Sequence, residues 1–541
     1  MSNNNLLRGT FVLTLGTYIS RFLGMIYVIP FYAMLGETGG TLFQMGYAQY
    51  TIFLSIATAG LPMAVSKYVS KYNSMGDYQT SRRIFKAGMF VMLITGFAAF
   101  IALYFLAPSF AQSALSEKQL SGISLEDVIA VIRMVSLALI VVPIMSLIRG
   151  FFQGHQSMGP TAVSQVIEQI VRIVFLLVSV YLIINVFNGD FVTAVGYATF
   201  AAFVGAMGGL IVLIMYWVKR KDSLLAMREN VVPSESQSLG TMFKELFKYA
   251  GPFVFVGLAI PIYNYIDTNT FNKAMIDGGH GDKAVSLFSI VVFYIPKLIM
   301  IPVSLATAFG LTLVPTITKS FTKRNLKLVN HYIDQALQII MFFVLPAVVG
   351  LIVLAGPAYT LFFEYKEEGV SLLQLYAPVA LLFSFFTVSA AILQGINKQK
   401  LAVFCLLFGI LLKLSLNAPL ITMFQGAGSI LATAIGFIGS IIYSFAMIKK
   451  HAKYQFKRFF KRSIFMAILA LFMGLLVSVT HSILGIFIQY QDGRLQSAII
   501  LLVAIGAGAI AYLYLAYRSH LIERLFGDRF SRFFKRRKAA S

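Results

Sequence analysis

The sequence predicts an all-α polytopic membrane protein with about 14 transmembrane helices, and three observations lead to this fold class. Charged residues make up 12% of the chain and hydrophobic residues 58%, whereas a soluble protein is charged at about a quarter of its positions. The hydrophobic residues fall in runs of about 20, the length that crosses the hydrocarbon core as a helix. The strict alternation of a membrane barrel is absent, and Lys and Arg gather in the gaps between runs.

The individual helices follow from the apolar runs in order. We place them at residues 9–35, 41–65, 87–110, 128–149, 161–187, 192–218, 249–273, 285–316, 333–355, 371–394, 402–421, 428–448, 463–489 and 497–517. The first run is predicted to be a span and not a cleavable signal, because it continues past Arg21 to Leu35 without a small-residue cleavage site. The tenth and eleventh runs are short and carry polar residues.

The distribution of basic residues predicts the topology. With the N-terminus in the cytoplasm, most of the 44 Lys and Arg fall on the inner side, as the positive-inside rule requires. These inner segments are 67–86, 149–160, 219–230, 319–327, 397–400, 449–462 and the tail from Arg518. The outer gaps hold Lys118, Arg133, Lys273, Lys283, Lys366 and Arg494. We therefore expect a multi-pass protein of the cell membrane with both termini in the cytoplasm, and we interpret the basic runs as topology and headgroup attraction, not nucleic-acid binding.

An internal repeat divides the predicted helices into two lobes. Residues 151–173 align without gaps on 392–414, so that Gln153-Gly154 falls on Gln394-Gly395 and Arg172 on Lys413. A looser match sets 66–71 against 315–320. We expect an N-lobe of six spans (1–218), a cytoplasmic linker (219–248), a C-lobe of six spans (249–448), a C-terminal helix pair (449–518) and a basic cytoplasmic tail (519–541). Two related bundles suit alternating access around a central site.

Six ionisable residues lie within the predicted spans: the cations Arg21, Arg172, Lys297 and Lys413, and the acids Glu168 and Asp267. A lone charge at the bilayer centre costs roughly 2.5–3.5 kcal/mol even on insertion scales. Each of these residues should therefore face a partner or a water-filled cavity, and together they are the candidate site residues.

The spacing of these residues suggests partners for some of them. Glu168 and Arg172 are four residues apart on one helix, so they share a face and are able to pair. This pattern fits either a self-neutralised structural pair or a substrate site. Lys413 has Gly409, not an acid, four residues before it. It is expected either to face the cavity or to snorkel to the interface.

Arg21 and Lys297 are the leading candidates for binding an anion. Arg21 has no acid within a turn, and Lys297 lies between Pro296 and Pro302, which are expected to kink the helix. One residue belongs to each lobe, so a cleft between the lobes would be cationic and attract phosphate. The alternative is an interhelical ion pair, for example between Lys297 and Asp267. Asp267 is otherwise a candidate for binding a coupling proton or Na+.

No pattern in the sequence indicates catalysis, a cofactor or a metal site. The six His are scattered, the single cysteine Cys405 lies in an apolar run, and no phosphate-binding GxxxxGK[ST] motif occurs. The glycine-rich stretch 205–209 is expected to permit close helix packing and not to bind phosphate. The protein is therefore expected not to be an enzyme.

Several segments identify a family resemblance: SRFLG (20–24), AGLPMAVSKYVSKY (59–72), RGFFQG (149–154), KLIMIPVSLATAFGLTLVPTITKSF (297–321) and LQGINKQ (393–399). Over essentially the whole chain, the sequence resembles the MurJ-type lipid II flippases of the MOP exporter superfamily, in the Gram-positive polysaccharide-biosynthesis branch that includes SpoVB-like proteins. The resemblance implies fourteen helices, a flipping role for Arg21 and a cavity position for Lys297. It also implies that the last helix pair, within 449–518, forms a groove for the polyprenyl tail. Gram-negative-type members carry an Arg-Asp pair where this chain has Tyr27-Val28, and an arginine in helix two where it has Leu54 and Ser55.

The resemblance implies a flippase that moves the undecaprenyl-pyrophosphate-linked peptidoglycan precursor, lipid II, across the cytoplasmic membrane by alternating access. Its partners would be this lipid-linked anionic oligosaccharide, membrane lipids and the cell-wall synthesis machinery. Coupling to the membrane potential, H+ or Na+ stays open. Alternatives are a flippase for another lipid-linked polysaccharide, a sporulation-specific relative, a multidrug antiporter, a non-transporting scaffold, and a membrane enzyme that uses the external cluster Glu364, Glu367 and Glu368.

Overall fold

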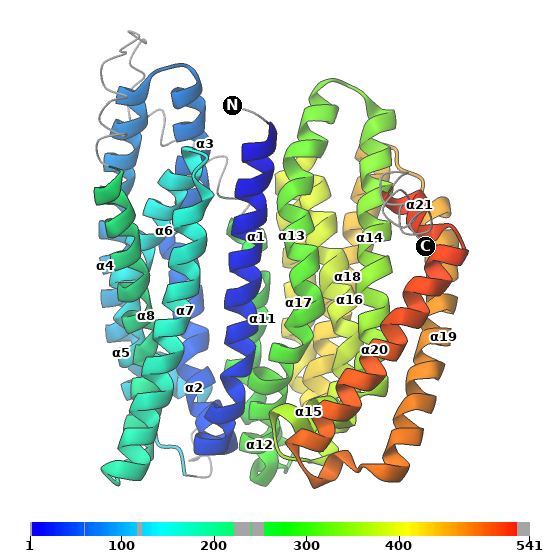
Figure 1. Cartoon of the computed structure of the whole chain (residues 1–541). Helices are drawn as coiled ribbons and strands as arrows, with labels where there is room; N and C mark the ends of the chain where they lie inside the picture. Colours follow the sequence, from blue (N-terminus) through cyan, green and yellow to red (C-terminus); the bar gives the residue numbers. More distant parts are fainter. Residues whose placement is uncertain are drawn as a thin grey trace. The chain divides into compact units, whose positions relative to one another are not determined.

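The computed structural model describes residues 3–58, 60–115, 122–220 and 254–526, together with Gly240 and Gly251. Over these residues the regular structure is helical, with no strand, and twelve helices are long and apolar enough to cross a membrane. Figure 1 shows the long helices running alongside one another within each part of the chain. The predicted all-α membrane fold is confirmed.

The chain divides into two compact units, and the first is Met1–Tyr294. Its described elements, in order, are α1 (Asn3–Ile26), α2 (Val28–Thr58), α3 (Leu61–Ser74), α4 (Tyr78–Ala114), α5 (Leu125–Ser136), α6 (Ala138–Gly154), α7 (Met158–Tyr181), the π-helical turn η1 (Leu182–Val186), α8 (Phe191–Lys219), α11 (Ala259–Asp277), the 3-10 turn η2 (Gly281–Lys283), α12 (Ala284–Phe288) and the π-helical turn η3 (Ser289–Tyr294).

The second unit is Ile295–Ser541. Its described elements are α13 (Ile295–Thr322), α14 (Leu326–Val353), α15 (Ala355–Phe362), α16 (Glu367–Gly395), α17 (Gln399–Phe424), α18 (Gly426–Ala452), α19 (Lys457–Phe487), the 3-10 turn η4 (Tyr490–Asp492), α20 (Arg494–Arg518) and α21 (Leu521–Phe526). In this unit α19 and α20 pack against each other, and α14 packs against α19.

The helices lie where the apolar runs predict them. The twelve candidate spans correspond to all the predicted helices except the first and the seventh, at whose positions lie α1 and α11. Most of the predicted linker, 219–248, and the tail from residue 527 lie outside the described residues. The boundary between the compact units falls at Tyr294, later than the predicted linker, because α11 and η3 pack against α2.

One expected helix break is confirmed and one is not. Helical hydrogen bonding continues from α1 through Tyr27 into α2, as the single run 9–35 predicts, and the chain bends at Gly36, whose φ of 57° and ψ of −155° suit glycine alone. The break therefore falls in the predicted gap after residue 35. By contrast, α13 is one continuous helix through Pro296 and Pro302. The irregular backbone precedes these prolines as the π-helical turn η3.

The predicted repeat is visible in the turn geometry of both units. After α6, the N–H groups of Gln156 and Ser157 donate to the carbonyls of Gln153 and Phe152, and Gln156 has a φ of 56°. The connection after α16 has the same hydrogen bonds. The N–H groups of Asn397 and Lys398 donate to the carbonyls of Gln394 and Leu393, and Asn397 has a φ of 59°. The sequence match therefore marks the same tight helix–helix connection in each unit.

Candidate functional site

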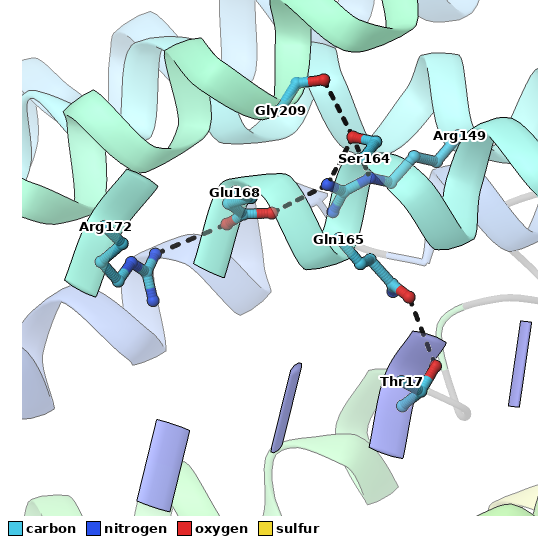
Figure 2. Close-up of polar contacts among 7 residues, drawn as sticks. All are labelled: Thr17, Arg149, Ser164, Gln165, Glu168, Arg172 and Gly209. Atoms are coloured by element: carbon cyan, nitrogen blue, oxygen red, sulfur yellow. Dashed lines mark hydrogen bonds and ion pairs between the residues drawn. The ribbon is translucent and has the colours of Figure 1, made fainter. Parts of the chain in front are cut away.

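A polar face runs along α7 in the first unit. Ser164, Glu168 and Arg172 are spaced four residues apart, so they line one side of the helix. Figure 2 shows this row beside Arg149 of α6 and Gly209 of α8. The spacing correctly predicts that Glu168 and Arg172 lie together: Arg172 Nη2 is 3.5 Å from Glu168 Oε1.

Glycines on α8 allow this polar face to pack closely. A Cβ atom at Gly205 would lie 2.8 Å from the Arg172 Cβ and 2.8 Å from the Glu168 carbonyl oxygen. A Cβ at Gly209 would lie 3.2 Å from Arg149 Nη2. The glycine-rich stretch of α8 thus serves close helix packing, as predicted, and it leaves room for the charged side chains between α6, α7 and α8.

Arg149 is held firmly at the centre of this polar network (Figure 2). Its Nη2 donates to Glu168 Oε2 at 2.8 Å and to Ser164 Oγ at 2.7 Å. Its Nε lies 3.2 Å from the same Ser164 oxygen. Ser164 in turn donates to the Gly209 carbonyl at 2.9 Å. Three helices therefore fix the Arg149 guanidinium, and Glu168 forms ion pairs with two arginines at once.

Arg172 is held more loosely than Arg149. Besides the 3.5 Å contact with Glu168, its Nη1 donates to the Tyr47 hydroxyl at 3.4 Å. Both distances are near the limit for hydrogen bonding. The Arg172 side chain is 22% exposed, against 12% for Arg149 and 15% for Glu168. Of the three charged groups, Arg172 is the most accessible.

Arg21 lies on an exposed part of α1. The helix packs closely against α7: a Cβ at Gly16 would lie 2.9 Å from the Ala162 Cβ, and Thr17 Oγ1 is 3.3 Å from Gln165 Oε1. Arg21 is exposed and forms no salt bridge with a carboxylate among the described residues. Its guanidinium is open to a ligand from outside this unit's core.

The two cations of the second unit differ in environment. Lys413 of α17 is fully buried, and its Nζ donates to Thr433 Oγ1 of α18 at 2.6 Å. In this structure it therefore neither faces a cavity nor snorkels. Lys297 is partly exposed in the first turn of α13, directly after the π-helical turn η3. Such turns are frequent at functional sites.

The remaining acid, Asp267, lies on α11 and is 5% exposed. It belongs to the first unit and Lys297 to the second, so their pairing stays a prediction. In the described residues, no group of three or more His, Cys, Asp or Glu could hold a metal ion.

Arg149 is the residue that the sequence interpretation missed. It was assigned to the inner segment 149–160 as a topology signal, but α6 extends to Gly154, so Arg149 is inside the helix. Its partner Glu168 is 19 residues away on another helix. The repeat offers no help, because the position that aligns with Arg149 holds Ala390. One signal was available in the sequence: Arg149 ends an apolar run, and the next run contains the acid Glu168.

Family models and curated relatives match the chain over long stretches. The family model described as "Polysaccharide biosynthesis protein" matches residues 6–321, and the MatE model matches residues 252–419. The chain is 59% identical to "Lipid II flippase MurJ" of Bacillus subtilis, over 99% of this chain and 100% of that protein. It is 27% identical to "Stage V sporulation protein B" of the same organism, over 78% of this chain and 79% of that protein.

Solved structures show the same fold. A structure of "Lipid II flippase MurJ, inward closed conformation" matches with a TM-score of 0.65 and 15% identity, over 95% of this chain and 99% of that chain. An inward-facing MATE transporter of the MOP superfamily matches with a TM-score of 0.62 and 15% identity, over 80% and 98% of the two chains. Together with the match over the whole sequence, these findings show that the chain is a multi-pass membrane protein that belongs to the MurJ family of the MOP superfamily.

Proposed function

We propose that this protein is a flippase that translocates lipid II, the undecaprenyl-pyrophosphate-linked peptidoglycan precursor, across the cytoplasmic membrane. The observation that carries the proposal is the 59% identity, over the full length of both chains, to a lipid II flippase. The identity to the sporulation protein is 27% over a smaller share, so a sporulation-specific substrate is not favoured.

The transported headgroup is an anion, and the chain offers cations to bind it. Arg21 is exposed on α1, and Arg172 is the accessible arginine of the α7 network. Lys297 is partly exposed on α13. A guanidinium can bind a pyrophosphate in bidentate fashion and an ammonium acts as a point charge. In this proposal the pyrophosphate binds these three residues in turn or together as access alternates, and the tail occupies the groove of α19 and α20.

Energy coupling and topology are further parts of the proposal. With both termini in the cytoplasm, the membrane potential acts on the cationic site at about 2.3 kcal/mol per charge per 100 mV and favours its return to the inner side. Asp267, buried on α11, is proposed as the group that binds a coupling ion or balances a cation. Lys413, buried against Thr433, would join the site only after a rearrangement of α17 and α18.

Depletion of the protein with the leaflet position of lipid II followed by an external probe tests the function. Wild-type protein should restore the outer-leaflet signal, and the Arg21→Ala, Lys297→Ala double variant should reduce the flipping rate by at least an order of magnitude, since two charged contacts are removed. Lys400→Ala, at an exposed lysine in the first turn of α17, is the matched control.

Each outcome has a distinct meaning. If depletion leaves the outer-leaflet signal unchanged, the flippase proposal fails. If the double variant flips as fast as the control while the wild type is needed for the signal, the assignment of Arg21 and Lys297 is wrong and the function stands.

A further inference from the structure

The α7 network contains two guanidinium groups and one carboxylate. Arg149 and Arg172 both contact Glu168, one on each carboxylate oxygen. The three side chains together therefore carry one net positive charge, whereas Glu168 and Arg172 alone would be neutral.

The two arginines share Glu168 unequally. Arg149 makes contacts of 2.7, 2.8 and 3.2 Å, all anchored to α7. Arg172 makes contacts of 3.4 and 3.5 Å only. The short charged contact is the stronger one, so Glu168 is neutralised mainly by Arg149. Arg172 keeps most of its capacity to bind another anion.

Arg172 also has donor capacity to spare. Its Nε is buried and has no hydrogen-bond partner among the described residues, although a guanidinium offers five N–H donors. Tyr27, Tyr47 and Tyr50 lie close enough to interact electrostatically with it. An incoming phosphate oxygen could replace the long contacts to Glu168 and Tyr47 at little cost, because few good hydrogen bonds would be lost.

We propose that Arg149 is a positioning residue for headgroup binding: it neutralises Glu168 and thereby keeps Arg172 available to a phosphate oxygen of the substrate. This inference rests on the proposed lipid II flipping. Without Arg149, Glu168 would turn to Arg172 and form a neutral pair, and the first unit would lose its inner cationic site. Arg149 itself is not proposed to touch the substrate, because Ser164 and Glu168 occupy its Nε and Nη2 and it is less exposed than Arg172.

Glutamine substitutions, which remove the charge but keep a polar side chain, test this role. The measurement is the Kd of the purified protein for lipid II. Arg149→Gln should weaken binding about tenfold or more, as expected for the loss of a desolvated charged contact. Adding Glu168→Gln to that variant removes the carboxylate and should restore binding to near the wild-type level. Glu168→Gln alone should bind several-fold more tightly than wild type. Arg172→Gln should weaken binding, and Glu168→Gln should not rescue it, since Arg149 remains anchored to Ser164.

A purely structural role for Arg149 gives the opposite pattern. In that case the double variant Arg149→Gln, Glu168→Gln would bind as poorly as Arg149→Gln, or worse, with a matching loss of thermal stability, and the proposal would be overturned. If Arg149→Gln does not fold, the single variant Glu168→Gln decides, because weaker binding by this folded variant contradicts the inference. Lys400→Gln is the control for surface charge. Failure of wild-type protein to bind lipid II would instead overturn the proposed function itself.

Discussion

His155, in the turn between α6 and α7, makes the stability of the folded protein depend on pH. Burial lowers the pKa of His155 below its ordinary value of 6.5, and nearby Arg82 adds to this effect, although the hydrogen bond of Nδ1 to the Phe151 carbonyl opposes it. The unfolded chain therefore binds a proton at a higher pH than the folded protein does. Stability should fall as the pH drops below 6.5 and level off below the folded-state pKa.

Thermal unfolding of purified protein at pH 7.5 and at pH 5.5 checks this expectation. His155→Gln, which keeps a hydrogen-bonding side chain but does not titrate, should lose less stability between the two pH values than wild type. An equal loss in both proteins would show that other groups set the acid response.

Side-chain partners within one helix were predictable at the residue scale, and partners across helices were not. The i, i+4 spacing places Glu168 beside Arg172 whatever the tertiary structure. The contact of Arg149 with Glu168 depends on how α6 crosses α7, and the burial of Lys413 depends on Thr433 of the neighbouring α18. Residue spacing does not show how helices cross, so the surroundings of Arg149 and Lys413 could not be predicted from the sequence.

At the scale of elements, the crossing of α3 and α6 depends on a glycine. A Cβ at Gly150 would lie 2.3 Å from the carbonyl oxygen of Pro62, and a backbone atom cannot rotate away. Gly150→Ala should therefore destabilise the protein by about 1–3 kcal/mol, the usual cost of overpacking. Gly350→Ala in α14 is the matched control, since its Cβ would meet open space.

Thermal unfolding of the two variants in the same detergent measures the difference. Gly350→Ala should unfold at or above the wild-type temperature, because alanine favours helix more than glycine does. If Gly150→Ala were as stable as this control, α3 and α6 would not approach as closely as described.

Helix positions were more predictable than helix breaks. The apolar runs fix where the spans lie, because hydrocarbon must be crossed by a continuous hydrogen-bonded helix. The single run 9–35 correctly predicts that helix continues through Tyr27, and the gap after residue 35 marks the bend at Gly36. The prolines of α13 suggested a kink where the helix is continuous. Pro296 is in the first turn, where a missing N–H group is tolerated.

At the scale of the whole molecule, the predicted topology assigns each connection to one side of the membrane. Cys405, the only cysteine, is buried, so introduced cysteines can be labelled selectively. In intact cells, Asp492→Cys, exposed between α19 and α20, should react with an impermeant thiol reagent. Gln455→Cys, exposed between α18 and α19, should react only after the membrane is opened. The reverse pattern would invert the proposed orientation.

The repeated helix–helix connection was predictable from sequence, but the boundary between the compact units was not. Alignment of 151–173 with 392–414 identified two copies of the connection found after α6 and after α16. Along the chain, the boundary between the compact units follows Tyr294, inside the predicted eighth span. Packing of η3 against α2 sets this boundary, and such long-range packing leaves no periodic signal in the sequence.

The turns after α6 and after α16 have the same geometry, so this polypeptide contains two copies of one structural element. Gln156 and Asn397 adopt the same left-handed backbone with the same hydrogen bonds, yet their flanking residues differ. A substitution introduced at one position and then at the other probes identical geometry in two chemical settings, at one expression level and in one bilayer. Differences between the two outcomes then report on surroundings alone, a comparison that usually requires two separate proteins.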